Sequence, residues 1–249
     1  MNYFSICGDV LHYLSFFILI FKICRNKSCA GISAKSQVLF ATVFTVRYIN
    51  IFAKYNFSYL SICKVMFLIL SYVILGLIFF LYYSTYNRSK DTFPVLYIIL
   101  PVLALSLVFN YNVIDHGIEN YWKYLLQNPY EVAWAFSIYL EALAIVPQYI
   151  MISNTGDGLR IRAYVVVMTM YRIFYICNWI YRYYFESRSD PISFISGSIE
   201  VIILILTLIK IQECTSNNPK WQERTKIFTI EGSKIKKTSE KEDLLPLTV

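Results

Sequence analysis

Long runs of apolar residues, separated by short polar stretches, follow one another along residues 1–211. A helix needs about 20 apolar residues to cross a bilayer, and the runs are close to this length. Because lipid offers the backbone no hydrogen-bond partner, each run is expected to form a helix. The pattern predicts seven membrane-spanning helices, at residues 3–23, 36–53, 59–83, 94–114, 131–152, 163–186 and 192–211.

The pattern changes at residue 212, after which the chain is polar and charged. Segments that bury little apolar surface stay unfolded. We therefore expect two parts, a seven-span domain at residues 1–211 and a disordered tail at residues 212–249.

Composition strengthens this interpretation. Hydrophobic residues make up 57% of the chain and charged residues only 16%, whereas an ordinary soluble domain carries about 25% charged residues. A single soluble core of this size cannot hide so much apolar surface. The composition excludes a soluble enzyme, a disordered chain and a nucleic-acid-binding module, despite the net charge of +7.

Basic residues are distributed unequally between the two ends of the predicted spans. The first, third and fifth connections and the segment from Lys210 onward hold 15 Lys and Arg, and the opposite side holds three. Because basic loops stay in the cytosol, we expect a lumenal N-terminus and a cytosolic C-terminus.

Several ionisable residues interrupt the predicted spans, where charge is costly and usually faces a protein interior or a wet cavity. Three arginines near one another would attract an anion such as a carboxylate. The alternative is that they pair with Asp9, Glu141 and Asp190 only to hold the bundle together. The in-span charges considered are Asp9, His12, Arg47, Glu141, Arg172 and Arg182.

No catalytic motif is visible, and the six cysteines have no paired-ligand spacing. We therefore expect no enzymatic activity, no cofactor and no metal site. His12 lies one helical turn after Asp9, so it is either a proton sensor or a hydrogen-bonded core residue.

Several sequence segments resemble the KDEL receptor family over about residues 1–200. They include Gly8-Asp9, Arg47-Tyr48 and Tyr171-Arg172, together with the longer segments Ser28-Cys29-Ala30-Gly31-Ile32-Ser33, Trp134-Ala135-Phe136-Ser137-Ile138-Tyr139-Leu140-Glu141 and Asn178-Trp179-Ile180. The resemblance implies an all-α membrane protein of two three-helix repeats and a linker helix, similar to sugar transporters of the SWEET/PQ-loop type.

The resemblance also implies a function. Members of this family capture escaped endoplasmic-reticulum (ER) proteins in the Golgi by a C-terminal Lys-Asp-Glu-Leu or His-Asp-Glu-Leu and return them in coated vesicles. The expected partners are therefore ER lumenal proteins with such a signal, and vesicle coat components at the cytosolic tail, with no nucleic acid. The expected location is the ER and Golgi membranes. Two alternatives remain open, a small-solute carrier of the same architecture and a family member that has lost cargo binding.

Site residues follow from the resemblance by position. A proton-sensing cluster is implied for His12, Glu141 and Tyr171. The implied signal-binding residues are Ser5, Arg47, Tyr48, Asn50, Lys54, Glu131, Trp134, Arg172, Tyr175, Asn178, Trp179 and Arg182.

Three of these positions depart from the family pattern. The family has arginine at Ser5, aspartate at Asn50 and asparagine at Lys54, and it has aspartate where this chain has Leu206. The loop before Glu131 is about a dozen residues longer than in the family. We expect signal preference to differ for these reasons.

The tail carries two candidate sorting signals. One is a basic cluster at Lys234, Lys236 and Lys237, and the other is an acidic dileucine pattern ending at Leu244 and Leu245. Such short patterns recur by chance, and of the two we favour the lysines.

Overall fold

The computed structural model describes residues 2–53, 59–116, 128–156 and 158–217, with backbone only at 49–53, 59–63 and 115–116. Every regular element in these ranges is helical. The helices are α1 (Tyr3–Asn26), α2 (Ala34–Ala53), α3 (Tyr59–Gly76), α4 (Leu96–Val108), α5 (Tyr111–His116), α7 (Pro129–Leu143), α8 (Val146–Thr155), α9 (Arg162–Glu186) and α10 (Pro191–Ser216), with short helices η1 (Leu77–Leu81), η2 (Tyr83–Thr85) and η3 (Leu159–Ile161).

Local sequence explains where the long helices begin and end. The Asn2 side chain accepts a hydrogen bond from the Ser5 amide at 2.9 Å and caps α1. Asp190 caps α10 in the same way through the Ser193 amide, and Pro191 occupies the first turn, where no donor is lost. Lys27 ends α1 in the left-handed conformation.

The described residues contain six helical segments that are long and apolar enough to cross a membrane, which confirms an all-α membrane protein. The segments are Tyr3–Asn26, Lys64–Leu81, Leu96–Ile114, Pro129–Thr155, Leu159–Glu186 and Pro191–Ser216. The helix α2, whose last five side chains lie outside the described set, corresponds to the remaining predicted span.

Two predicted spans are divided, and the last helix is longer than expected. The span at 94–114 is broken before α5, where the Asn110 side chain accepts from the Val113 amide at 3.2 Å and starts a new helix. The span at 131–152 is broken between α7 and α8, because Pro147 has no amide hydrogen to donate to the preceding turn. Helix α10 continues to Ser216, past the predicted start of the tail at residue 212.

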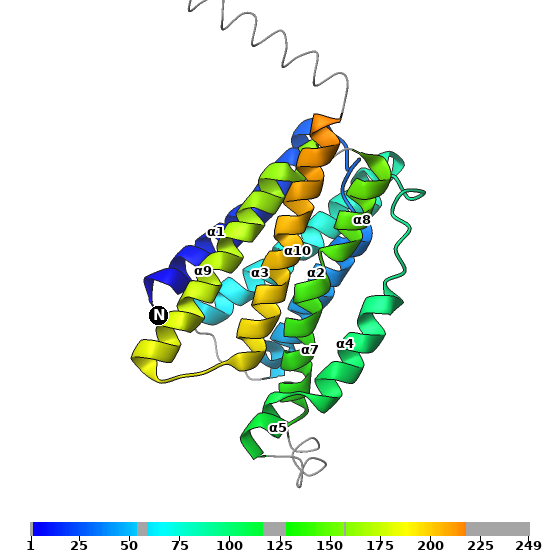
Figure 1. The fold of residues 1–249 in the computed structure, drawn as a ribbon. Helices are drawn as coiled ribbons and strands as arrows, with labels where there is room; N and C mark the ends of the chain where they lie inside the picture. The colour runs from blue at the N-terminus through cyan, green and yellow to red at the C-terminus, as the bar shows by residue number, and fades with distance from the viewer. Residues whose placement is uncertain (1, 54–58, 117–127, 157, 218–249) are drawn as a thin grey trace, which may run out of the picture.

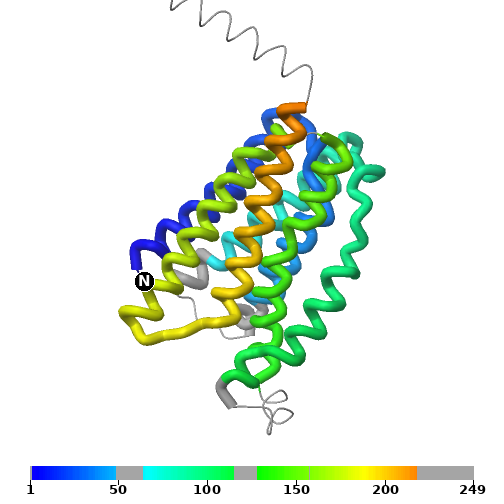
Figure 2. The backbone as a smooth tube through the Cα atoms, viewed as in Figure 1, coloured from blue at the N-terminus to red at the C-terminus, as the bar shows by residue number. Residues whose placement is uncertain are grey.

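The helices run alongside one another in one bundle (Figure 1). The N-terminus, α5 and the start of α10 lie at one end, and α8 and the end of α10 lie at the other (Figures 1 and 2). Helix α1 packs along α9, and α2 packs along α7, while α4 contacts α7. The first helix of each three-helix unit thus contacts the second helix of the other unit, as expected for two repeats joined by α4.

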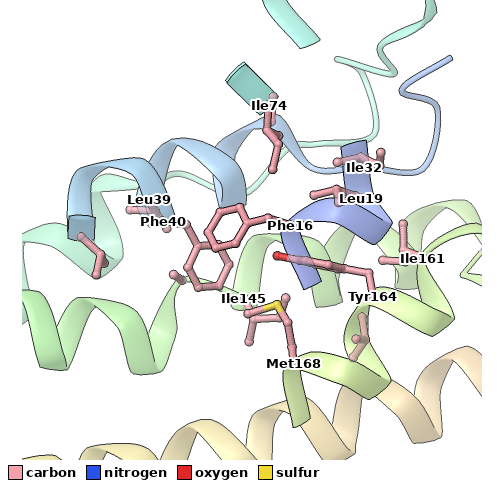
Figure 3. Packing of buried hydrophobic residues seen from close by; sticks show 14 of the residues in the cluster. Phe16, Leu19, Ile32, Leu39, Phe40, Ile74, Ile145, Ile161, Tyr164 and Met168 are labelled. Carbon is pink, nitrogen blue, oxygen red and sulfur yellow. The ribbon is translucent and has the colours of Figure 1, made fainter. Parts of the chain in front are cut away.

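A large part of the apolar core lies in the half of the bundle away from the N-terminus. Phe16 and Leu19 of α1 meet Phe40 of α2 and Met168 of α9, and all four are buried. Figure 3 shows these side chains with their neighbours Ile145 and Tyr164.

A buried hydrogen-bond network ties the two units together at the end of the bundle opposite the N-terminus. Both Asp91 carboxylate oxygens accept from Ser33 Oγ at 2.9 Å, and one also accepts from the Tyr86 hydroxyl at 2.7 Å. Gln148 of α8 accepts from the Ser33 amide at 2.8 Å and donates to the Gly31 carbonyl at 2.9 Å. Burial and the Asp91 hydrogen bond raise the pKa of Tyr86 above its usual range, so its hydroxyl stays protonated and keeps donating.

Candidate binding cavity

A cavity of about 610 Å³ lies in the half of the bundle nearest the N-terminus. Its volume is in the usual range of small-molecule and peptide-terminus sites. Side chains from α1, α2, α3, α7, α9 and α10 line it, so residues far apart in sequence meet there. The polar residues of its wall are Asp9, His12, Tyr13, Arg47, Tyr48, Lys64, Trp134, Glu141, Arg172, Tyr175 and Ser193.

An ion-pair network crosses the floor of this cavity. Arg47 of α2 contacts Glu141 of α7 at 2.8 Å, and Arg172 of α9 contacts the other oxygen of Glu141, also at 2.8 Å. Arg172 contacts Glu200 of α10 at 2.5 Å. Charges taken out of water need such partners, because an unpaired buried charge is strongly destabilising. The network therefore joins α2, α7, α9 and α10.

Glu200 is a functional candidate that sequence reasoning missed. It lies within the predicted span at 192–211 and is only 1% exposed. An acid inside an apolar run normally faces a protein interior, so the sequence did contain a signal for it. With Glu200 included, the two arginines face two carboxylates, and the network carries no net formal charge.

His12 packs within aromatic rings next to this network. Its ring stacks on Tyr171 with centroids 4.2 Å apart and an interplanar angle of 3°. Phe67 lies on another side at 4.6 Å, and Phe16 and Phe44 complete the cage. The Tyr171 hydroxyl donates to Glu200 at 3.1 Å and accepts from Arg172 at 3.1 Å. His12 is thus coupled to the ion pairs through Tyr171, while Glu141 is held by the arginines.

Two further charged residues face the cavity. The Asp9 carboxylate accepts a hydrogen bond from the Tyr175 hydroxyl, and this bond joins α1 to α9. Lys64 of α3 lines the wall and was not predicted as a site residue. It is a cation inside a predicted span, which is the signal that would have identified it.

A second hollow of about 220 Å³ adjoins the cavity and shares Trp134 with it. Glu131, Tyr130, Tyr111 and Asp190 line this hollow. The Arg47 guanidinium lies 5.8 Å from the Trp134 ring centroid, a cation–π distance. The two spaces therefore meet at Trp134, and polar and aromatic side chains line both of them.

The structure places some predicted residues outside the cavity. Arg182 is partly exposed and pairs with Glu186 at 3.2 Å, so it does not join Arg47 and Arg172 as the third arginine expected near them. Trp179 packs on Gly197 and lines a separate, largely apolar hollow of about 350 Å³. Asn178 is buried, and Ser5 is half-buried, but neither lines the cavity.

Other predicted residues fall outside the described part of the chain. The side chain of Asn50, the whole of Lys54, and the tail residues Lys234, Lys236, Lys237, Leu244 and Leu245 lie there.

Comparison with known proteins relates this geometry to a family. A family model described as "ER lumen protein retaining receptor" matches residues 28–182. The chain is 42% identical over 203 residues to ER lumen protein-retaining receptor 3 of Danio rerio, covering 81% of this chain and 88% of the relative. It is 43% identical over 204 residues to the ER lumen protein-retaining receptor of Dictyostelium discoideum (82% and 90% covered). It is 40% identical over 204 residues to ER lumen protein-retaining receptor 2 of Homo sapiens (82% and 90% covered).

Proposed function

The chain belongs to the family of ER lumen protein retaining receptors, and we propose that it captures ER lumenal proteins by an acidic C-terminal retrieval signal of the Lys-Asp-Glu-Leu type. It is a multi-span membrane protein of the secretory pathway and a receptor rather than an enzyme.

The observation that carries this proposal is the meeting of Arg47 and Arg172 in one cavity beside Lys64 and Trp134. A peptide ending in Asp-Glu-Leu brings two side-chain carboxylates and a terminal carboxylate. Guanidinium forks bind such groups in a bidentate, oriented way. Glu131, in the adjoining hollow, offers a negative charge for a basic residue at the fourth position from the end.

Capture requires an exchange of partners, because both arginines are already paired with Glu141. A proton on His12 adds positive charge next to Tyr171 and offsets the incoming carboxylates. We therefore assign His12, Glu141 and Tyr171 to the step that couples binding to pH. The reference pKa of histidine is about 6.5, which lies between the pH of a mildly acidic compartment and that of a neutral one.

Binding of a labelled Lys-Asp-Glu-Leu peptide to the full chain in lipid nanodiscs tests the proposal. We expect binding that is abolished by amidation of the peptide C-terminus and by Arg172→Gln. Arg25→Gln is the matched control, because Arg25 lies near the other end of α1 and contacts Phe21. Equal binding of the amidated peptide would contradict the proposal.

The alternative of a small-solute carrier makes a different prediction. Such a carrier would take up a solute into proteoliposomes and would not bind the peptide. A receptor that has lost cargo binding would do neither, and Ser5 is the position that motivates this alternative.

We further propose the orientation and traffic of the receptor. The basic connections favour a lumenal N-terminus, with residues 1–211 as the receptor domain and 212–249 as a cytosolic tail that binds vesicle coat components. Cycling between Golgi and ER membranes then follows from capture at lower pH and release at higher pH.

A further inference from the structure

Glu200 has no role in the proposed function, although it is central to the ion-pair network. Its Oε2 lies 2.5 Å from Arg172 Nη2, closer than Glu141 Oε1 at 2.8 Å. The Tyr171 hydroxyl donates to Glu200 Oε1 at 3.1 Å, so both carboxylate oxygens are held. Glu200 does not line the cavity, and it reaches a ligand only through Arg172.

In its present contacts, Arg172 does not bind any carboxylate through two parallel N–H donors. A single nitrogen, Nη2, serves Glu141, Glu200 and Tyr171. The Nε of Arg172 is buried and has no hydrogen-bond partner among the described residues. A guanidinium binds a carboxylate most strongly as a fork of two parallel donors. An incoming carboxylate that engages this fork can therefore replace the present partners.

Glu200 also decides the charge that an incoming peptide meets. Arg47 and Arg172 are balanced by Glu141 and Glu200, so the network is formally neutral. Charge interactions are strong in a site of low dielectric constant. Without the Glu200 carboxylate, the same network would carry one positive charge for an acidic ligand.

We propose that Glu200 is an internal competitor of the retrieval signal. It is a positioning residue that holds Arg172 in the empty receptor and yields it to one carboxylate of the bound peptide. This inference rests on the proposed function. It adds that competition by Glu200 limits the affinity of the receptor for the signal, so that cargo can be released as well as captured.

A binding experiment on the full chain in nanodiscs tests the inference. Dissociation constants of wild type and Glu200→Gln are measured for a peptide ending in Lys-Asp-Glu-Leu. They are also measured for its variants with Asn for Asp, with Gln for Glu, and with an amidated C-terminus. We expect Glu200→Gln to bind the parent peptide at least tenfold more tightly, or about 1.4 kcal/mol. The gain should vanish for the peptide that lacks the carboxylate paired with Arg172, which is the signature of direct coupling.

The matched control is Glu213→Gln, which removes an exposed acid from the same helix and should leave the affinity unchanged. An unchanged or weaker affinity in Glu200→Gln, or the same gain for every peptide, overturns the inference while the proposed function stands. Failure of wild type to bind the parent peptide removes both. If Glu200→Gln does not fold, Glu200→Asp keeps the charge on a shorter arm. It should then show a smaller gain with the same dependence on the peptide.

Discussion

Gly197 of α10 is a position where an added methyl group should disturb the packing of α10 against α9. A Cβ built there would lie 2.5 Å from Trp179 Cζ3, 2.9 Å from Cη2 and 3.5 Å from Arg172 Cδ. Because the indole is rigid, α9 or the Trp179 side chain has to move. Overpacking of this kind costs about 1–3 kcal/mol. Alanine also favours the helix over glycine by about 1 kcal/mol.

Gly76→Ala separates these two effects. Gly76 ends α3 with helical dihedral angles, and nothing lies within 4 Å of its added Cβ. It should therefore show the helix-propensity gain alone. The difference between Gly76→Ala and Gly197→Ala then reports the overpacking term, about 1–3 kcal/mol.

Thermal unfolding of both variants in the same detergent is the assay. For a chain of this size, 1 kcal/mol corresponds to about 2–4 °C in Tm. We expect Gly197→Ala to melt at least about 2 °C below Gly76→Ala, because Trp179 has to give way to the added methyl group. Equal melting temperatures of the two variants would refute the close packing of Trp179 on Gly197.

Three further predictions concern pH, signal choice and traffic. Peptide affinity should rise as pH falls from about 7.5 to about 5.5, since the protonated His12 favours the loaded form. The affinity of His12→Gln should not depend on pH in this range, and an unchanged pH dependence in this variant would show that another group senses pH. Asn50→Asp should restore a preference for Lys over Asp at the fourth position from the signal's end by about tenfold, because a carboxylate at the rim attracts a cation, and competition binding of the two peptides measures this. In cells, imaging should show the receptor trapped in the Golgi when the tail lysines are replaced. The double substitution Leu244→Ala with Leu245→Ala should leave its location unchanged, and movement of this variant out of post-Golgi structures would favour the acidic dileucine signal instead. The lysines replaced in that experiment are Lys234, Lys236 and Lys237.

The sequence was sufficient for the fold class but not for the internal geometry of the helices. Apolar length identifies the membrane segments, because crossing a bilayer is mainly a question of hydrophobic length. It does not reveal the break at Asn110, where a side-chain cap inside an apolar run starts a new helix. It also does not reveal the break before Pro147, since proline is tolerated within membrane helices when neighbours satisfy the backbone. Here Ser36 Oγ donates to the Ala144 carbonyl at this break.

The sequence predicted which face of a helix a site residue occupies better than it predicted the position of that residue along the helix axis. Arg172 and Arg182 lie on similar faces of α9, but ten residues of helix separate them by about 15 Å along the axis. Arg172 therefore reaches the cavity, whereas Arg182 reaches the helix end and Glu186. Glu200 lies beyond the last segment that carries the family resemblance, so only its place inside an apolar span points to it.

The buried network around Asp91 matters for proton leakage, because a membrane protein can lie between compartments of different pH. Chains of ionisable side chains inside a membrane protein form proton relays, and a relay from one face to the other would let protons leak between the two compartments. Between the cavity and this network lie the apolar side chains of Phe16, Leu19 and Met168, which carry no proton. Beyond them, Asp91, Ser33 and Gln148 are fixed by hydrogen bonds to one another and to the backbone. The residues proposed to sense pH are thus set apart from the Asp91 network, and that network serves to lock the two three-helix units together at the end of the bundle opposite the N-terminus.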